Sequence, residues 1–564
     1  MRGRGGGSWC RLLENRPNAS STHLGASRAS GSAHPSADPA ATLPSNSKDL
    51  DRNCGRTPLL SVTSESTATE QLNMKRWVIP ITLGLTVCIL VTLVLTLLAT
   101  KSTLQPGTKF GLVFDAGSSH TSLFMYQWPA DKENDTGVVS QTMTCDVTGD
   151  GISSYAQKPE AAGKSLKPCL DKAMELIPAA QLTQVPVYLG ATAGMRILSL
   201  QDPKAANQVL AEVSKTIQEY PMDFRGARII SGAEEGVYGW ITINYLLDTF
   251  IKYSVKNKGW IHPPATKMLG ALDLGGASTQ ISFFPSGSIA DPTTASHFRL
   301  YGFNYTIYTH SYLCYGQAQA QKQVIVKLTQ ESQGTPGRIQ HPCFHKGFEE
   351  KVTAQSIYDS PCTAYLQPSG VNLNQEMILV GTGNVTKCRQ AIRAIFNFTA
   401  CGPHHSCAFN GTYQPDVNGQ FFAFSAFYYT FAFLNITSGQ SLAEVLNIIE
   451  HYCSRNWTDV TASYPKQNLQ WLQDYCANAN YILILLLEGY KFSEKSWTSI
   501  IFQQKASETD IGWTLGYMLN LTNIIPAEAP VHVRTQKKGY WVTSIFFLVL
   551  TLVAALVLLL AYFL

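Results

Sequence analysis

Charged residues are scarce in this chain, and their scarcity excludes several classes of protein. Only 15% of the 564 residues are Asp, Glu, Lys or Arg, and 43 basic side chains nearly balance 39 acidic ones. A near-neutral chain with 45% hydrophobic residues is neither a strongly basic nucleic-acid binder nor a disordered chain. A P-loop is also lacking: residues 162–165 imitate its end, but Lys158 stands where the motif requires Gly.

Charge is absent altogether from two long apolar stretches, residues 77–99 and 540–564. With 23 and 25 residues, each is long enough to cross a hydrocarbon core of about 30 Å as a helix. We therefore predict one transmembrane helix near each end of the chain. A secretory signal peptide is the alternative for the first stretch, but its apolar run is too long for one.

The charges next to the first stretch predict its orientation. Lys75 and Arg76 precede it directly, which favours a cytosolic N-terminus and an extracellular location for residues 101–539. Residues 1–76 are rich in Ser, Gly, Ala and Thr and show no sustained periodicity, so we predict a disordered cytosolic tail.

Glycosylation sequons and cysteines concentrate in the segment between the two helices, as expected of an extracellular domain. Eight acceptor asparagines begin Asn-X-Ser/Thr sequons: Asn134, Asn304, Asn384, Asn397, Asn410, Asn435, Asn456 and Asn520. Ten of the 13 cysteines lie there, an even number that suits five disulfides: Cys145, Cys169, Cys314, Cys343, Cys362, Cys388, Cys401, Cys407, Cys453 and Cys476. The segment 401–407 could also be a zinc site, although a disulfide is favoured outside the cell.

Two distant segments repeat one pattern. A strand-like run ends in Asp, a Gly-rich turn follows, and a second strand-like run comes after the turn. Asp115 opens the first turn and Asp273 opens the second. Glycines allow backbone N–H groups to approach an anion, and a carboxylate at the turn favours a divalent cation that also contacts phosphate. Asp and Gly are also good hairpin-turn residues, and for either motif alone that alternative has equal weight. Their repetition favours a phosphate site.

Two further motifs lie between these turns. Residues 190–196 place Thr192 at a strand-to-helix turn, which suits anion binding. Taken alone, this motif is better explained by ordinary helix capping by Thr192, with Arg196 as a solvated charge. Glu234 and Glu235 begin a predicted helix, where acidic residues interact favourably with the helix dipole. Adjacent helical residues point about 100° apart, so only one of the two can face a cleft and accept a proton from water.

Together these motifs resemble the apyrase regions of the ecto-nucleoside triphosphate diphosphohydrolases, in order and spacing. The matching segments are 115–119, 190–196, 234–240, 273–280, 489–492 and 513–520. The resemblance covers residues 101–539 and implies an α/β fold of two RNase H-like lobes, as in actin, Hsp70 and sugar kinases, with an interlobe cleft. Lobe I would comprise 101–222 with a C-terminal return over 500–539, and lobe II would comprise 223–499.

The resemblance also implies an activity, the hydrolysis of nucleoside tri- and diphosphates to the monophosphate, which depends on Ca²⁺ or Mg²⁺. Glu235 would be the base that activates water, helped by Gln280 and Thr192, and Asp115 and Asp273 would hold the metal. The phosphate path would be lined by Ser118, Ser119, His120, Ala193, Gly275, Gly276, Ala277 and Ser278. Ala233 stands where the family usually has Gln, which puts any role of that side chain in doubt.

For the aromatic segment 419–430, the resemblance implies a base pocket in which Tyr429 stacks on the nucleobase. It further implies five disulfide pairs: Cys145–Cys169, Cys314–Cys362, Cys343–Cys388, Cys401–Cys407 and Cys453–Cys476. Spacing alone could not choose among the pairings.

The expected protein is a plasma-membrane enzyme with two helices in the lipid bilayer, nucleotide substrates and no nucleic-acid partner. Association of the transmembrane helices into a homo-oligomer stays open. Two other functions remain as alternatives: a lumenal nucleoside diphosphatase of the Golgi or lysosome, and a non-catalytic nucleotide-binding ectodomain.

Overall fold

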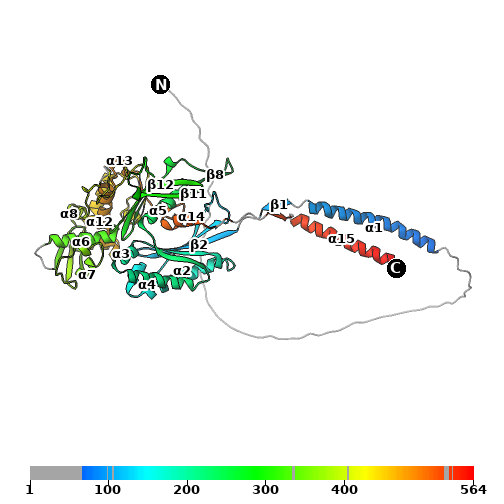
Figure 1. The fold of residues 1–564 in the computed structure, drawn as a ribbon, viewed down its shortest axis with the longest axis horizontal. Helices are drawn as coiled ribbons and strands as arrows, with labels where there is room; N and C mark the ends of the chain where they lie inside the picture. Colours follow the sequence, from blue (N-terminus) through cyan, green and yellow to red (C-terminus); the bar gives the residue numbers. More distant parts are fainter. Residues whose placement is uncertain are drawn as a thin grey trace, which may run out of the picture. The chain divides into compact units, whose positions relative to one another are not determined.

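The computed structural model describes residues 66–97, 100–103, 107–332, 337–402, 406–525, 527, 532–535 and 538–563. Contacts divide the chain into a small unit, residues 1–89 and 549–564, and a large unit, residues 90–548. Within the large unit, two mixed β-sheets carry the fold (Figure 1).

The first sheet has five strands in the order β4-β3-β2-β5-β6. Its strands are β2 (Thr108–Ala116), β3 (Thr121–Pro129), β4 (Ser140–Asp146), β5 (Pro186–Ala191) and β6 (Asp223–Ile229). The pairs β2–β3 and β3–β4 are antiparallel, whereas β2–β5 and β5–β6 are parallel. The helices of this half are α2 (Pro159–Leu176), α3 (Ala193–Gln201) and α4 (Pro203–Gln218), of which α2 and α4 lie side by side (Figure 1).

The second sheet has six strands in the order β11-β12-β10-β9-β16-β17. Its strands are β9 (Gly270–Leu274), β10 (Ser278–Phe283), β11 (Ala295–Leu300), β12 (Phe303–Leu313), β16 (Phe421–Ser425) and β17 (Ile500–Phe502). An antiparallel hairpin, β9–β10, is again followed on one side by antiparallel β12 and on the other by parallel β16 and β17. Apart from the extra edge strand β11, this is the strand order and direction of the first sheet.

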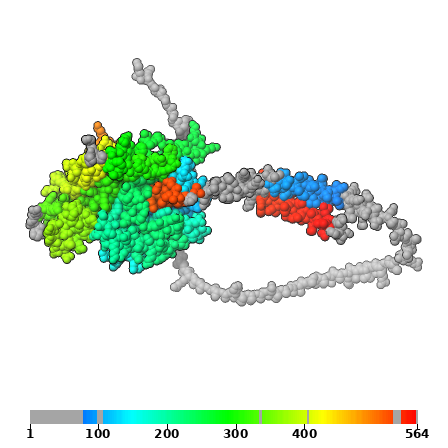
Figure 2. Space-filling model, viewed as in Figure 1, coloured from blue at the N-terminus to red at the C-terminus, as the bar shows by residue number. Residues whose placement is uncertain are grey.

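Helices α5 (Gly232–Leu246) and α14 (Trp513–Thr522) pack against each other, and α5 also contacts β9, β10 and β12. Gly516 permits the close approach, because a Cβ atom there would overlap the Tyr238 carbonyl oxygen. In Figure 2 the orange segment near residue 515 is flanked by cyan-green and green parts of the chain. Thus α14, which comes late in the chain, packs against α5, the helix that carries Glu235.

The remaining elements mostly surround the second sheet. A three-stranded sheet is formed by β13 (Arg338–His341), β14 (Glu349–Thr353) and β15 (Glu376–Gly381). The helices are α6 (Gln317–Glu331), α7 (Ala354–Tyr358), α8 (Val385–Arg393), α9 (Ala426–Phe433), α10 (Leu442–Cys453), α11 (Trp457–Ser463), α12 (Leu469–Ile484), the π-helix Leu485–Gly489 and α13 (Glu494–Trp497). Short two-stranded pairs are β1 (Thr100–Thr103) with β20 (His532–Thr535), β7 (Lys252–Ser254) with β8 (Gly259–Ile261), and β18 (Lys505–Ala506) with β19 (Thr509–Asp510).

Strand pairing shifts the lobe boundaries that we predicted at 222/223 and 499/500. Residues 223–229 form β6, which pairs with β5 of the first sheet. Residues 500–502 form β17, which pairs with β16 of the second sheet. A division into two lobes remains our proposal, with the first boundary moved beyond β6 and the second beyond β17.

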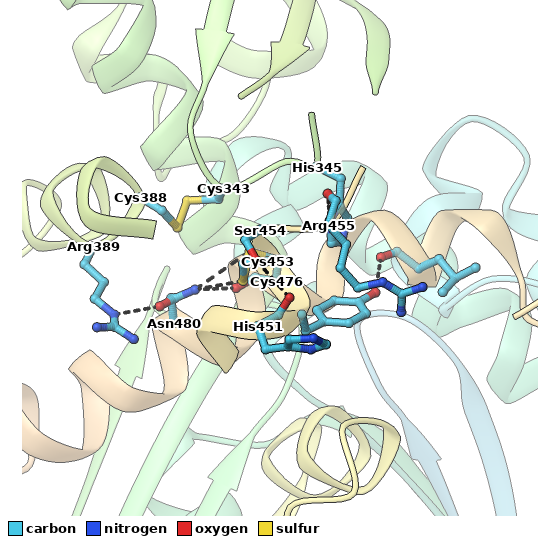
Figure 3. The surroundings of a disulfide bond; sticks show 12 residues. Cys343, His345, Cys388, Arg389, His451, Cys453, Ser454, Arg455, Cys476 and Asn480 are labelled. Atoms are coloured by element: carbon cyan, nitrogen blue, oxygen red, sulfur yellow. Dashed lines mark hydrogen bonds between the residues drawn. A yellow bond between two sulfur atoms is a disulfide. The ribbon is translucent and has the colours of Figure 1, made fainter. Parts of the chain in front are cut away.

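Five disulfides join the ten cysteines in the pairs that the resemblance implied. Around two of them the interior is polar as well as apolar (Figure 3). The fully buried Asn480 accepts a hydrogen bond from Arg389 Nε at 2.8 Å and donates one to the Cys476 carbonyl at 2.9 Å. This amide therefore ties α8 to α12 beside the Cys453–Cys476 disulfide.

Two long apolar helices, α1 (Ser66–Leu97) and α15 (Lys538–Phe563), match the predicted membrane spans. The stretches apolar enough to cross a membrane are Trp77–Thr96 and Gly539–Leu560. The prediction that 66–76 belongs to a disordered tail is wrong, because α1 begins at Ser66 and this segment contains Ala, Glu, Gln, Leu and Met, which favour helix. The rest of the predicted tail, residues 1–65, lies outside the described residues.

Candidate functional site

Asp115 and Asp273 occupy equivalent positions in the two sheets. Each is the second-last residue of its strand, β2 or β9, just before the hairpin turn. Asp115 pairs with Ser122 across the first hairpin, and Asp273 pairs with Gln280 across the second. The repetition seen in the sequence is therefore a repetition of structure.

The two hairpin turns face each other. A Cβ atom on Gly276 would lie 2.8 Å from Ser118 Oγ and 3.2 Å from Ser119 Oγ. Gly194, in the first turn of α3, approaches the same segment, since its Cβ would lie 2.8 Å from Ser118 Cα. Glycine at both positions thus lets two backbone segments meet around Ser118 without steric overlap.

Both aspartates are half-buried and close enough to influence each other. Burial raises the pKa of Asp115 to about 6, although Trp513 and His120 oppose the rise. Burial also raises the pKa of Asp273 to about 6; Ser425 opposes this rise and the negative charge of Asp115 adds to it. One oxygen of Asp115, Oδ1, is buried without a hydrogen-bond partner. An unpartnered buried carboxylate oxygen is well suited to a cation.

The adjacent glutamates of α5 have different environments. Glu234 forms a capping box with Ser231, whose Oγ accepts from the Glu234 N–H at 3.2 Å while a Glu234 oxygen accepts from the Ser231 N–H at 2.9 Å. It also pairs with Arg228 at 2.8 Å. Glu235 is buried, with only 8% of the residue exposed. Glu234 therefore caps α5 at the surface, whereas the Glu235 side chain points into the interior.

The Glu235 carboxylate is held by side chains from α3 and β10. Arg196 forms an ion pair with it, and Gln280 Nε2 lies 2.9 Å from the same oxygen. Arg196 and Gln280 also lie 3.1 Å and 2.7 Å from Ser278 Oγ. Gln280 Nε2 is in addition 3.1 Å from Ser311 Oγ of β12. Four elements therefore converge on Glu235, including the helix that carries it.

Burial also dominates the protonation of Glu235, raising its pKa to about 8. The Arg196 guanidinium opposes this rise, and the negative charges of Asp273 and Asp115 add to it. The three acidic groups therefore share one electrostatic site. A carboxyl whose pKa lies near neutral pH is suited to accepting and releasing a proton.

The remaining predicted phosphate residues lie around the same turns and differ in their exposure to solvent. Ser119 and His120 are exposed, and Ser118 is half-buried. The Gly275 N–H donates to the Ser278 carbonyl at 3.0 Å within its own turn, so in this arrangement that amide does not face an anion. The prediction that Gly275 lines the phosphate path stays a prediction.

Thr192 and Ala193, at the start of α3, are buried. Thr192 is the N-cap residue of α3, but its side chain makes no capping hydrogen bond, which removes the capping explanation that we weighed from the sequence. Its N–H donates to the Ala116 carbonyl at 3.0 Å, so the start of α3 is fixed beside the end of β2. Ala277 and Ser278, the last two predicted phosphate residues, are likewise buried.

Tyr429 lies on α9 with 51% of the residue exposed, as a ring that stacks on a ligand requires. Burial is the main cause that raises the pKa of Tyr429, and the negative charges of Asp510, Asp146 and Asp273 add to the rise. Ser425, just before α9, has φ +54°, an unusual conformation for a residue other than glycine.

This geometry can be compared with known proteins. The model of the GDA1/CD39 (nucleoside phosphatase) family matches residues 101–534. The chain belongs to this family. The match covers both hairpin turns, Thr192, Glu235 and the elements that return through α14. The prediction of an apyrase-type hydrolase is confirmed.

Relatives of this GDA1/CD39 protein refine the comparison. The chain is 56% identical to ectonucleoside triphosphate diphosphohydrolase 8 of Gallus gallus, over 80% of this chain and 91% of the relative. It is 50% identical to the protein of that name from Homo sapiens, over 82% and 93%. Identity to ectonucleoside triphosphate diphosphohydrolase 2 of Mus musculus is 47%, over 81% and 90%. The resemblance of the sequence motifs to the ecto-nucleoside triphosphate diphosphohydrolases is confirmed, and these relatives include type eight.

A solved nucleoside triphosphate hydrolase structure from Neospora caninum has a similar fold, with a TM-score of 0.51 and 14% identity. The match covers 79% of this chain and 96% of that one. Together with the two sheets of shared strand order, it confirms the predicted α/β fold class.

Sequence reasoning missed Arg196 and Ser311 of this GDA1/CD39 site. Arg196 was weighed only as a solvated charge, yet its side chain is 14% exposed and paired with Glu235. Ser311 lies opposite Gln280 in the β10–β12 register, a pairing that no local motif reveals. Trp513 was included only by resemblance; its indole lies against Gly190, where a Cβ would overlap the ring.

Seven of the eight sequon asparagines are exposed, whereas Asn520 is half-buried within α14. Because a glycan acceptor must be accessible, the half-buried Asn520 is the weakest of the eight proposed glycosylation sites.

Proposed function

We propose that the protein is an extracellular hydrolase that converts nucleoside tri- and diphosphates to the nucleoside monophosphate, with Glu235 as the catalytic base. The observation that carries the proposal is the Glu235 carboxylate, buried between Arg196 and Gln280 in the field of Asp115 and Asp273. The names of the relatives, which specify nucleoside triphosphate diphosphohydrolases, support the substrate class.

In the proposed step, the oxygen of a water molecule attacks the terminal phosphorus while Glu235 accepts a proton from that water. The bond from that phosphorus to the bridging oxygen breaks, so inorganic phosphate and a nucleotide shortened by one phosphate result. Gln280 Nε2, at 2.9 Å from the base, orients Glu235 and the water. Positioning of this kind supplies much of the catalysis of phosphoryl transfer.

Asp115 and Asp273 are the residues that would hold Ca²⁺ or Mg²⁺, and the unpartnered buried oxygen of Asp115 fits such a ligand. Within the described ranges, no group of three or more His, Cys, Asp or Glu forms a metal cluster, so water and phosphate oxygens would complete the coordination. When bound, the cation supplies positive charge that offsets the charge developing on the phosphate. Thr192 and the serines of the first turn would contact the phosphates, and Tyr429 would stack on the base.

The extracellular location rests on three features. Two candidate membrane spans precede and follow the two sheets in the sequence, five disulfides indicate an oxidising compartment, and seven exposed sequon asparagines are available for glycosylation. With Lys75 and Arg76 before the first span, we propose a cytosolic N-terminus and a plasma-membrane location.

The adjacent glutamates provide a matched test. Glu235→Gln should abolish phosphate release, whereas Glu234→Gln should retain it, because Gln still completes a capping box. Surface biotinylation of intact cells would verify that both variants are displayed. Turnover retained in Glu235→Gln would remove Glu235 as the base, and activity that persists in excess EDTA would contradict the metal site.

A further inference from the structure

A chain of hydrogen bonds connects Asp273 to a tyrosine from a distant part of the sequence. Tyr490 is fully buried and directly follows the π-helix Leu485–Gly489. Its hydroxyl lies 2.9 Å from Thr279 Oγ1, which lies 2.7 Å from the Asp273 carbonyl oxygen. π-Helical turns occur frequently at functional sites.

The direction of these hydrogen bonds follows from the groups involved. A carbonyl oxygen can only accept, so the Thr279 hydroxyl donates its single proton to Asp273. Thr279 then has no proton left, and the Tyr490 hydroxyl must be the donor to it. Burial raises the pKa of Tyr490 well above its usual value, which keeps the donor protonated. The chain therefore runs in one direction, toward the peptide group of Asp273.

Tyr490 itself is held independently of the β9–β10 hairpin. Its N–H donates to the Leu485 carbonyl at 2.7 Å, and its own carbonyl accepts from Gln414 Nε2 at 2.8 Å. Its ring also packs near Phe409, with the ring centroids 6.4 Å apart. A residue fixed in this way can act as a rigid support for the hairpin.

We propose that Tyr490 is a positioning residue that, through Thr279, fixes the peptide group of Asp273 and thereby the direction of its carboxylate toward the facing turn. The hydrogen bond from Tyr490 reaches the hairpin next to its turn. Thr279 pairs with Leu274 at the closing end of the hairpin, next to Gly275 and Gly276, which have no side chains to restrain the turn. The inference rests on the proposed function in that it assigns Asp273 to the metal.

The test compares Tyr490→Phe with a matched control, Tyr308→Phe, in the full chain in detergent. Tyr308 is also fully buried, and its hydroxyl donates to the Tyr413 carbonyl at 2.8 Å, which does not involve the hairpin turn. Hydrogen–deuterium exchange of residues 270–280, which leaves out the Tyr308 partner Phe283, is the first measurement, because it reports the hairpin without any metal. Loss of one hydrogen bond should speed this exchange about two- to ten-fold in Tyr490→Phe and leave it unchanged in Tyr308→Phe.

Two further measurements separate positioning from general stability. The Ca²⁺ concentration for half-maximal ATP hydrolysis should rise several-fold in Tyr490→Phe, with less effect on kcat at saturating Ca²⁺. Thr279→Val should have the larger effect on exchange, and adding Tyr490→Phe to it should change nothing more, because the tyrosine acts only through Thr279.

Equal exchange in Tyr490→Phe and Tyr308→Phe, or additive effects in the double variant, would overturn the inference. If the wild-type protein releases no phosphate, the proposed function fails, while the exchange data still decide whether Tyr490 supports the hairpin. The two failures are thus distinguishable.

Discussion

Replacing Arg196 by Met tests how the site controls the charge of Glu235. The substitution keeps an unbranched side chain of similar length and removes the guanidinium that pairs with the carboxylate. The charged groups that act on Glu235 are Arg196 from α3, Asp115 from β2 and Asp273 from β9. Of these three charges only Arg196 lowers the pKa of Glu235, so its loss leaves burial and two negative charges, which raise that pKa, opposed by the hydrogen bond from Gln280.

The size of the expected loss in activity follows from the ion pair between Arg196 and Glu235. A neighbouring opposite charge lowers the pKa of a carboxyl by about 1–3 units, and each unit is a factor of about ten in the ionised fraction at a pH below the pKa. If ionised Glu235 is the base, Arg196→Met should lower phosphate release about 10- to 1,000-fold near neutral pH. The acid limb of the kcat/KM profile should move to higher pH, and activity should recover partly in alkaline buffer.

The assay is phosphate release from ATP at saturating Ca²⁺ across the pH range, on membranes with matched surface expression. Arg228→Met is the control, because Arg228 pairs with the neighbouring Glu234 in a more exposed position. Arg196→Lys, which keeps a positive charge, should retain an acid limb close to that of the wild type. A loss in Arg196→Met that is equal at every pH would refute the reasoning, because it would mean that the arginine does not act through protonation of Glu235.

Three further predictions concern packing, stability and modification. Gly516→Ala should destabilise the protein by about 1–3 kcal/mol in thermal unfolding, because its Cβ overlaps the Tyr238 carbonyl oxygen; an unchanged melting temperature would contradict the α5–α14 contact. Burial and the charge of Glu350 raise the pKa of Asp474 from 3.8 to about 7, so folding stability should fall as pH rises through this interval. Asp474→Asn should therefore stabilise the protein above pH 7 and have no effect near pH 4, and equal effects at both pH values would contradict this. Asn520→Gln should leave the gel mobility of the expressed protein unchanged, whereas Asn134→Gln should reduce the apparent mass; a shift with Asn520→Gln would show that α14 is accessible.

Local sequence patterns predicted the features that lie within one helix or one hairpin. The two hairpin turns followed from Asp, Gly and small hydroxyl residues after apolar runs. The separation of Glu234 from Glu235 followed from helix geometry, and the two apolar spans followed from length and the absence of charge. In each case the determining residues are neighbours in the chain.

Features that join distant elements were not predictable in this way. Arg196 and Glu235 lie on different helices, α3 and α5, and are 39 residues apart in the chain, and Ser311 meets Gln280 only through the β10–β12 register. The boundary errors at β6 and β17 have the same origin, because parallel pairing joins strands separated by long crossovers. Chain periodicity carries no information on these contacts.

The shared strand order of the two sheets is an internal pseudo-symmetry, as a duplicated ancestral half would leave. The symmetry is broken where the halves meet, because the turn after Asp115 carries Ser118 and Ser119 while the turn after Asp273 carries Gly275 and Gly276. A serine in place of Gly276 would put its Cβ 2.8 Å from Ser118 Oγ. Two turns that both carried serine at this position would have to displace a side chain to lie this close, so the difference between the turns lets one keep its hydroxyl groups while the other approaches them closely.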